Sequence, residues 1–297
     1  MRAVGAEPGG GASVQLATPA TRDAATVILV SDRPDLHVLV MERTSRAVFS
    51  PGATVFPGGA VDPDDAGGAV AARLVGLDDP AASAEQGLPA GGLAYRAAAI
   101  RECFEEAGIL LAHDASSGRP VDHDDDLARS RSALNAGALG FGEFLAQRDL
   151  LCDARALRVF SHWLTPLGAP RRYNTWFFVA PAPEGEEGTH DDNELVASDW
   201  VRPADALAQY AAGAIDLIFP TEMSLRVLSR YATARDVLAD LDGVARDANG
   251  RPAVIGEGNG ERVALPHDAG RPTIPWTIPL PDISFRRERD EARKAHS

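Results

Sequence analysis

The segment from residue 97 to residue 109 constrains this chain more than any other, because its spacing separates apolar from acidic side chains. Apolar residues recur there every three or four positions, as on the buried side of a helix, at Ala97, Ile100, Cys103, Phe104 and Ala107. The same segment contains three acidic residues, Glu102, Glu105 and Glu106, at spacing i, i+3 and i+4. This spacing places them within about 100° of one another on the other side of the helix. Gly108 can end the helix, since glycine adopts the left-handed conformation of a C-terminal cap. We therefore expect a helix that is held by its apolar side and gathers three carboxylates.

The carboxylate cluster has two interpretations. Like charges that lie close together are costly unless a positive charge compensates them, and hard divalent cations with oxygen ligands are the usual solution. The other interpretation is an amphipathic helix whose acidic side is simply solvated, which is the commoner case. The helix alone does not decide between a metal site and a solvated surface.

The order of residues extends the argument. The sequence Arg101-Glu-Cys-Phe-Glu-Glu-Ala-Gly-Ile109 resembles the second half of the box that defines the Nudix hydrolases. The glycine-rich start of that box resembles Phe56-Pro-Gly-Gly59, so that Gly59 takes the glycine position and Asp65 the glutamate position. The standard box has seven residues between its glutamate and its arginine, but 35 residues separate Asp65 from Arg101, which implies an insertion of 28. Such a split box resembles the branch that includes the mammalian peroxisomal coenzyme A diphosphatases, although aspartate at 65 shortens the side chain by one methylene.

This resemblance implies an α/β fold, namely a single Nudix α/β/α sandwich with a mixed sheet. We expect a flexible tail over 1–22, the Nudix domain over 23–241 and a C-terminal extension over 242–297. Two Ala-, Gly- and Asp-rich segments, 66–92 and 113–135, are interpreted as insertions packed on the outside. Segments rich in strand-forming residues predict strands at 26–30, 37–41, 158–165, 173–179 and 194–201. Pro203 is suited to the first turn of a helix, and a further amphipathic segment covers 221–241.

The resemblance also implies roles for the acidic helix. Mg²⁺ or Mn²⁺ would be the cofactor, with Glu105 and Glu106 as direct ligands and Glu102 as a ligand or as the base that deprotonates water. Arg101 would orient a carboxylate rather than touch the substrate. The backbone of Gly58 and Gly59 can approach the ion or the phosphates, because no side chain intervenes.

A further acid outside the box often completes the metal site in this family. Glu194 is the candidate here, although it could equally be a surface glutamate on a strand.

The substrate is predicted from three arginines. Arg43 falls at the arginine of a family signature linked to coenzyme A, while Val48 replaces a basic residue of that signature. Arg171 and Arg172 precede a strand and are suitable contacts for phosphate, or else an ordinary exposed basic pair. We expect hydrolysis of coenzyme A or acyl-coenzyme A, with ADP-ribose or NADH as the alternative substrate. A non-catalytic Nudix-fold ligand sensor is a further alternative, disfavoured because the carboxylates of the box are present.

Charge and composition exclude other classes of protein. A net charge of −14 argues against nucleic acid as a partner, because binding to a phosphate backbone calls for a basic surface. The sequence has no run of 18 apolar residues and no signal-peptide pattern, so we expect no membrane association. Two cysteines provide no disulfide framework and suit the reducing cytoplasm. The expected partner is therefore a small nucleoside diphosphate derivative, and the sequence leaves the oligomeric state open.

Overall fold

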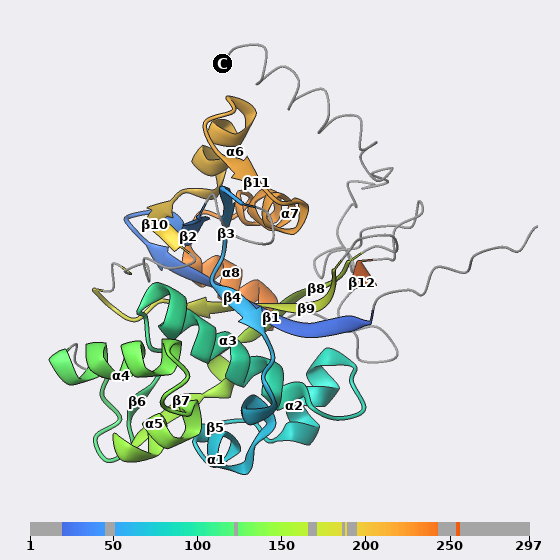
Figure 1. Ribbon diagram of the computed structural model, residues 1–297. Helices are drawn as coiled ribbons and strands as arrows, with labels where there is room; N and C mark the ends of the chain where they lie inside the picture. The colour runs from blue at the N-terminus through green and yellow to red at the C-terminus, as the bar shows by residue number, and fades with distance from the viewer. Residues whose placement is uncertain are drawn as a thin grey trace, which may run out of the picture.

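A mixed β-sheet of nine strands runs through the middle of the protein (Figure 1). The structure is a computed structural model that describes residues 20–44, 51–121, 124–165, 171–185, 188, 195–242 and 254–255. The strand order is β11-β3-β2-β1-β9-β8-β12, with β10 paired to β2 and β4 paired to β1. The strands of this sheet are β1 (Thr21–Asp32), β2 (Leu36–Arg43), β3 (Ala53–Val55), β4 (Gly58–Ala60), β8 (Arg158–Leu164), β9 (Arg172–Pro181), β10 (Leu195–Val201), β11 (Asp216–Leu217) and β12 (Val254–Ile255). A smaller sheet has the order β5-β7-β6 and consists of β5 (Leu74–Val75), β6 (His113–Asp114) and β7 (Leu150–Asp153).

The centre of the large sheet is formed by β1 and its two neighbours. β1 and β2 form an antiparallel hairpin in which Val30 pairs with Val38, as the turn residues between the two apolar runs predict. β9 lies parallel to β1 on its other side, from Thr21 opposite Arg172 onward, which makes the sheet mixed. The strand β1 therefore begins within the segment that the sequence assigned to a flexible tail.

Helices cover both faces of the sheet (Figure 1). One apolar core contains residues of α3, its neighbouring helices and one face of the sheet, and the other contains residues of α6, α7, α8 and the opposite face. The helices are α1 (Gly68–Ala71), α2 (Asp79–Gln86), α3 (Gly92–Ala107), α4 (Asp125–Asn135), α5 (Phe141–Gln147), α6 (Pro203–Ala211), α7 (Phe219–Leu228) and α8 (Ala234–Asp242), with short 3₁₀ helices at Pro63–Ala66 and Ala154–Ala156. The predicted α/β/α sandwich is confirmed. The amphipathic segment over 221–241 forms two helices, α7 and α8, rather than one.

The two insertions contribute to the core, and the prediction that they pack on the outside is wrong in this respect. Their apolar residues belong to the same cluster as α3 and the sheet, at Val70, Leu74, Ala82, Leu127 and Leu134. The reason is that short helices with one apolar side, although separated by glycine and proline, still bury that side against α3. Among the described residues, no helix has the length and apolar character that crossing a membrane requires.

The predicted acidic helix is α3. Its five apolar residues at helical spacing are at most 1% exposed, so this side faces the core as predicted. The helix ends at Gly108, whose φ of 69° lies in the left-handed region that favours glycine. α3 packs along β1 and β4, which places the carboxylates beside the glycine-rich turn.

Candidate functional site

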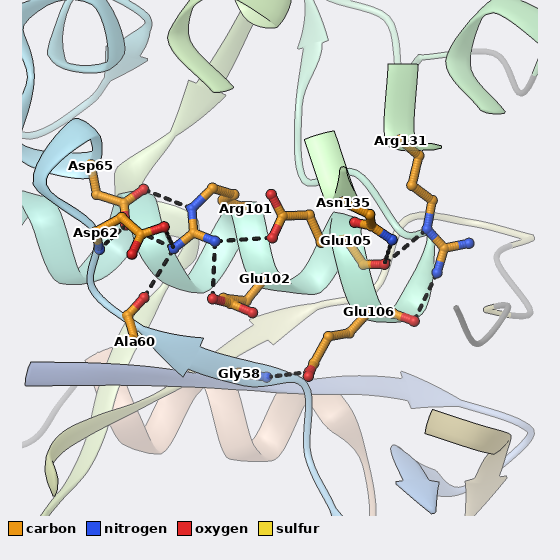
Figure 2. A network of polar contacts seen from close by, with 10 residues as sticks. All are labelled: Gly58, Ala60, Asp62, Asp65, Arg101, Glu102, Glu105, Glu106, Arg131 and Asn135. Atoms are coloured by element: carbon orange, nitrogen blue, oxygen red, sulfur yellow. Dashed lines mark hydrogen bonds and ion pairs between the residues drawn. The ribbon is translucent and has the colours of Figure 1, made fainter. Parts of the chain in front are cut away.

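Arg101 lies at the centre of the site and uses all five of its N–H donors (Figure 2). Nε and Nη2 donate to the two carboxylate oxygens of Asp65, at 3.0 and 2.9 Å. Nη2 also donates to the carbonyl oxygen of Ala60 at 2.9 Å. Nη1 donates to Glu102 Oε1 and to Glu105 Oε2, both at 2.9 Å. Arg101 thus orients two of the three carboxylates, as expected.

Asp65, the residue predicted for the glutamate position of the box, contacts Arg101. It is 3% exposed, and its Oδ2 also accepts the backbone N–H of Asp62 at 2.8 Å. The 3₁₀ helix Pro63–Ala66 brings the backbone close to α3. This close approach compensates for the methylene that aspartate lacks. The two halves of the split box therefore meet in space, although 35 residues separate them in sequence.

The glycine-rich turn lies against the carboxylates. The backbone N–H of Gly58 donates to Glu106 Oε2 at 2.8 Å, which holds the third carboxylate toward β4. A Cβ atom at Gly59 would lie 2.5 Å from Glu102 Oε1, so a larger residue would displace that side chain. A Cβ atom at Gly58 would lie 2.4 Å from the carbonyl oxygen of Ala25, so a close approach requires glycine at both positions.

The acidic groups are costly to ionise in this environment. Burial raises the pKa of Glu102 from 4.5 to about 7, while the charge of Arg101 opposes this shift and the charge of Glu105 adds to it. Burial also raises the pKa of Glu105, again against the charge of Arg101. Burial alone would lower the pKa of Arg101, but its hydrogen bond to Asp65 and the surrounding carboxylates raise it, so Arg101 stays charged. One arginine leaves the cluster with an excess of negative charge.

The donor set fits a hard divalent ion. Within the described part of the chain, no three acidic, histidine or cysteine side chains already surround a common point. Glu102 and Glu105 each turn one oxygen toward Arg101 instead. The three carboxylates nevertheless extend from one side of one helix, and the absence of a side chain at Gly59 lets the Glu102 carboxylate pack against the turn. Oxygen ligands of this kind are those that Mg²⁺ and Mn²⁺ prefer.

The predicted substrate-binding arginines lie at the end of the sheet where β1 and β9 begin. Arg43 is the last residue of β2, which runs antiparallel to β1. Arg172 is buried, and its Nε donates to the carbonyl oxygen of Thr165 at 3.0 Å, whereas Arg171 is exposed. Arg171 is therefore the more accessible of the pair. Glu194 and Val48 lie outside the described residues.

Two residues that contact the acidic helix were missed by the sequence analysis. Arg131 and Asn135 on α4 donate hydrogen bonds to backbone carbonyl oxygens of Glu105 and Glu106 (Figure 2). Their spacing of four residues places them on one side of a helix, but nothing in the sequence indicates which element that side would meet.

A second polar network lies at the start of α3. The side-chain amide of Asn174 on β9 donates to Asp23 on β1 at 2.8 Å and to the hydroxyl of Tyr95 at 3.2 Å. Burial is the main reason that the pKa of Tyr95 lies well above its ordinary value. The hydrogen bond between Tyr95 and Asp23, and the negative charge of Asp23, raise this pKa further. The network joins α3 to the two central strands β1 and β9.

Comparison with known proteins supports the same fold. The model of the NUDT19 Nudix domain matches residues 71–228, which includes α3. An acyl-coenzyme A diphosphatase NUDT19 from Gallus gallus is 31% identical over 270 residues, covering 73% of this chain and 70% of that protein. The Homo sapiens protein of the same name is 28% identical over 242 residues, covering 68% of this chain and 62% of its own length. The chain thus spans somewhat less than two thirds of the human protein.

A solved structure has a similar fold. The crystal structure of a NUDIX hydrolase from Alicyclobacillus acidocaldarius superposes with a TM-score of 0.59 at 29% sequence identity. The match covers 74% of this chain and 96% of that protein, so nearly the whole bacterial protein corresponds to part of this one.

Proposed function

This chain belongs to the Nudix hydrolases, in the family of the NUDT19 Nudix domain, and we propose that it is a metal-dependent diphosphatase of coenzyme A or acyl-coenzyme A. The products would be an adenosine bisphosphate and a phosphopantetheine or acyl-phosphopantetheine. The observation that carries this proposal is the contact of Glu102 and Glu106 with the Gly58-Gly59 turn, with Arg101 between Glu102 and Glu105.

The chemistry follows from these residues. A divalent ion held by the carboxylates would neutralise the charge of the diphosphate and polarise its phosphorus–oxygen bonds. Burial raises the pKa of Glu102 to about 7 in the metal-free protein, and a carboxylate in this position suits either a metal ligand or the group that accepts a proton from water. Arg101 holds Glu102 and Glu105 in place, and the Gly58-Gly59 turn holds Glu106 through a hydrogen bond and packs against Glu102. Water then attacks one phosphorus atom, and the bridging oxygen leaves with the other phosphate.

Two features support coenzyme A as the substrate. The relatives from Gallus gallus and Homo sapiens carry the name acyl-coenzyme A diphosphatase. Arg43 and the exposed Arg171 lie at the end of the sheet that carries the glycine-rich turn, and each can form a charge-assisted contact with phosphate. We therefore propose that one of them meets the 3′-phosphate, which ADP-ribose and NADH lack.

The test is a substrate panel with the purified protein. Acyl-coenzyme A, coenzyme A, dephospho-coenzyme A, ADP-ribose and NADH are each incubated with Mg²⁺ or Mn²⁺, and the products are identified by mass spectrometry. We expect the highest kcat/KM for the two substrates with a 3′-phosphate. Glu105→Gln and Glu106→Gln should each lower kcat by about a hundredfold or more, because an ion contributes several kcal/mol to catalysis.

Glu143→Gln is the matched control, since Glu143 is an exposed glutamate on the neighbouring helix α5. It should retain wild-type activity, and circular dichroism should show all three variants folded. Near-normal turnover in both Glu105→Gln and Glu106→Gln would refute the proposed metal site on α3. Faster cleavage of ADP-ribose or NADH would refute coenzyme A as the substrate.

A further inference from the structure

The second insertion is attached to the end of the acidic helix. Arg131 on α4 donates from Nε to the carbonyl oxygen of Glu105 at 3.0 Å and from Nη2 to that of Glu106 at 2.8 Å. Asn135, one turn further along α4, donates to the carbonyl oxygen of Glu105 at 3.3 Å. Figure 2 shows these three bonds at the C-terminal end of α3, on the backbone of the two predicted metal ligands.

These carbonyl groups are the part of a helix that most needs outside partners. The last four C=O groups of an α-helix have no intrahelical donor, and α3 ends at Ala107. The planar guanidinium of Arg131 donates to two successive carbonyl oxygens at once. The compact ammonium group of a lysine is less suited to this geometry. Its positive charge also lies at the negative end of the helix dipole. Arg131 therefore restrains the turn from which the side chains of Glu105 and Glu106 extend.

α4 is itself held firmly enough to act as a support. Its buried residues Leu127 and Leu134 belong to the core that contains α3. At its start, Asp124 accepts the backbone N–H of Leu127 at 2.6 Å and Arg148 Nη2 at 2.9 Å. An element anchored at its start and along its buried side can hold Arg131 in a defined position.

We propose that Arg131, assisted by Asn135, is a positioning residue for the metal site. By fixing the last turn of α3 it sets the directions of the Glu105 and Glu106 side chains, and hence the affinity for the divalent ion. This inference rests on the proposed function. In this role Arg131 acts through the backbone of Glu105 and Glu106, the groups to which it donates.

The test measures metal binding without substrate. Free Mn²⁺ is followed by electron paramagnetic resonance during titration of the wild type, Arg131→Leu, Arg131→Lys and Asn135→Ala. Arg131→Leu should raise the Kd by about tenfold or more, as loss of a group that orients ligands does. Arg131→Lys keeps the charge but not the planar guanidinium, so its Kd should lie between those of the wild type and Arg131→Leu. Asn135→Ala should raise the Kd less than Arg131→Leu does.

Arg129→Leu is the matched control. Arg129 lies on the same helix, is exposed and pairs with Asp126, so this variant removes the same charge without touching α3. It should bind Mn²⁺ as the wild type does. The melting temperature of every variant is measured in parallel, because a merely structural role would lower it while leaving the Kd unchanged.

The outcomes are distinguishable. A wild-type Kd in folded Arg131→Leu would overturn the positioning role and leave the proposed function standing. If Arg131→Leu does not fold, Arg131→Lys decides, and a wild-type Kd there would also overturn it. A wild-type protein that binds no Mn²⁺ would refute the metal site itself.

Discussion

At the scale of residues, the site depends on how one arginine is shared. Arg101 divides its donors between Asp65 in the first half of the box and Glu102 and Glu105 on its own helix. Lysine could not replace it, because an ammonium group lacks the planar fork that meets both oxygens of Asp65. The arrangement keeps the carboxylates close together and leaves Glu102 with a raised pKa.

The raised pKa of Glu102 predicts how the stability of the metal-free protein changes with pH. A carboxyl whose pKa rises from 4.5 to about 7 on folding binds its proton more tightly in the folded state. Its contribution to stability is fully present below pH 4.5 and is lost as the pH rises through about 7. We expect the free energy of unfolding to fall by on the order of 3 kcal/mol over this window. Urea denaturation of the wild type and of Glu102→Gln, each with a chelator, measures the effect.

Glu102→Gln should flatten this dependence, whereas the exposed control Glu143→Gln should retain it. Parallel pH curves for the wild type and Glu102→Gln would show that Glu102 ionises normally. Saturating Mg²⁺ should also flatten the curve of the wild type, because an ion stabilises the charged carboxylate.

At the scale of elements, both ends of α3 are held by the insertions. At the N-terminal end, Asp79 of α2 accepts the backbone N–H groups of Gly91 and Leu93, both at 3.0 Å. Ser83 Oγ accepts that of Gly92 at 2.9 Å. The helix thus has an acidic cap at its start, supplied by another helix, and the basic residue Arg131 at its end, in the order that the helix dipole favours.

Removal of the N-terminal cap should destabilise the protein. Asp79→Ala leaves two backbone donors without their acceptor, and we expect the free energy of unfolding to fall by about 1–2 kcal/mol. Asp64→Ala is the control, since Asp64 is an exposed aspartate outside α2 and α3. Urea denaturation compares the two variants. Equal stability of Asp79→Ala and the wild type would mean that water satisfies the start of α3.

At the scale of the whole molecule, the insertions and the sheet share one core. Leu134 of α4 and Leu29 of β1 belong to the same cluster of buried residues on the α3 face. The opposite face has its own cluster, against α7 and α8. An element that shares the core should not unfold separately from it.

This predicts one cooperative transition. Leu134→Ala should lower the free energy of unfolding by about 2–5 kcal/mol, as Leu29→Ala should, because each leaves a cavity in a packed core. Denaturation followed by both tryptophan fluorescence and circular dichroism measures the cost and the number of transitions. A cost below about 1 kcal/mol for Leu134→Ala, or a separate early transition, would place α4 outside the cooperative unit.

The sequence by itself determined those features that depend on local periodicity and residue type. The apolar spacing from Ala97 to Ala107 predicted α3 and its buried side, and Gly108 predicted its end. The family resemblance, rather than periodicity, assigned Gly58-Gly59 and Asp65 to the first half of the split box, and these residues contact α3. The runs of strand-forming residues predicted β1, β2, β8, β9 and β10. These predictions succeed because side-chain period and backbone conformation are linked within a few residues.

Tertiary structure alone decided which groups meet across long separations. The contact of Arg131 with the carbonyls of Glu105 and Glu106, and that of Asp79 with the start of α3, join segments whose residue types are ordinary. The same holds for the insertions, whose many glycines and prolines predicted external loops although their few apolar residues fill the core. The physical reason is that a backbone carbonyl or amide has no signature in the sequence. Its partner is chosen only when packing against the sheet brings two helices together.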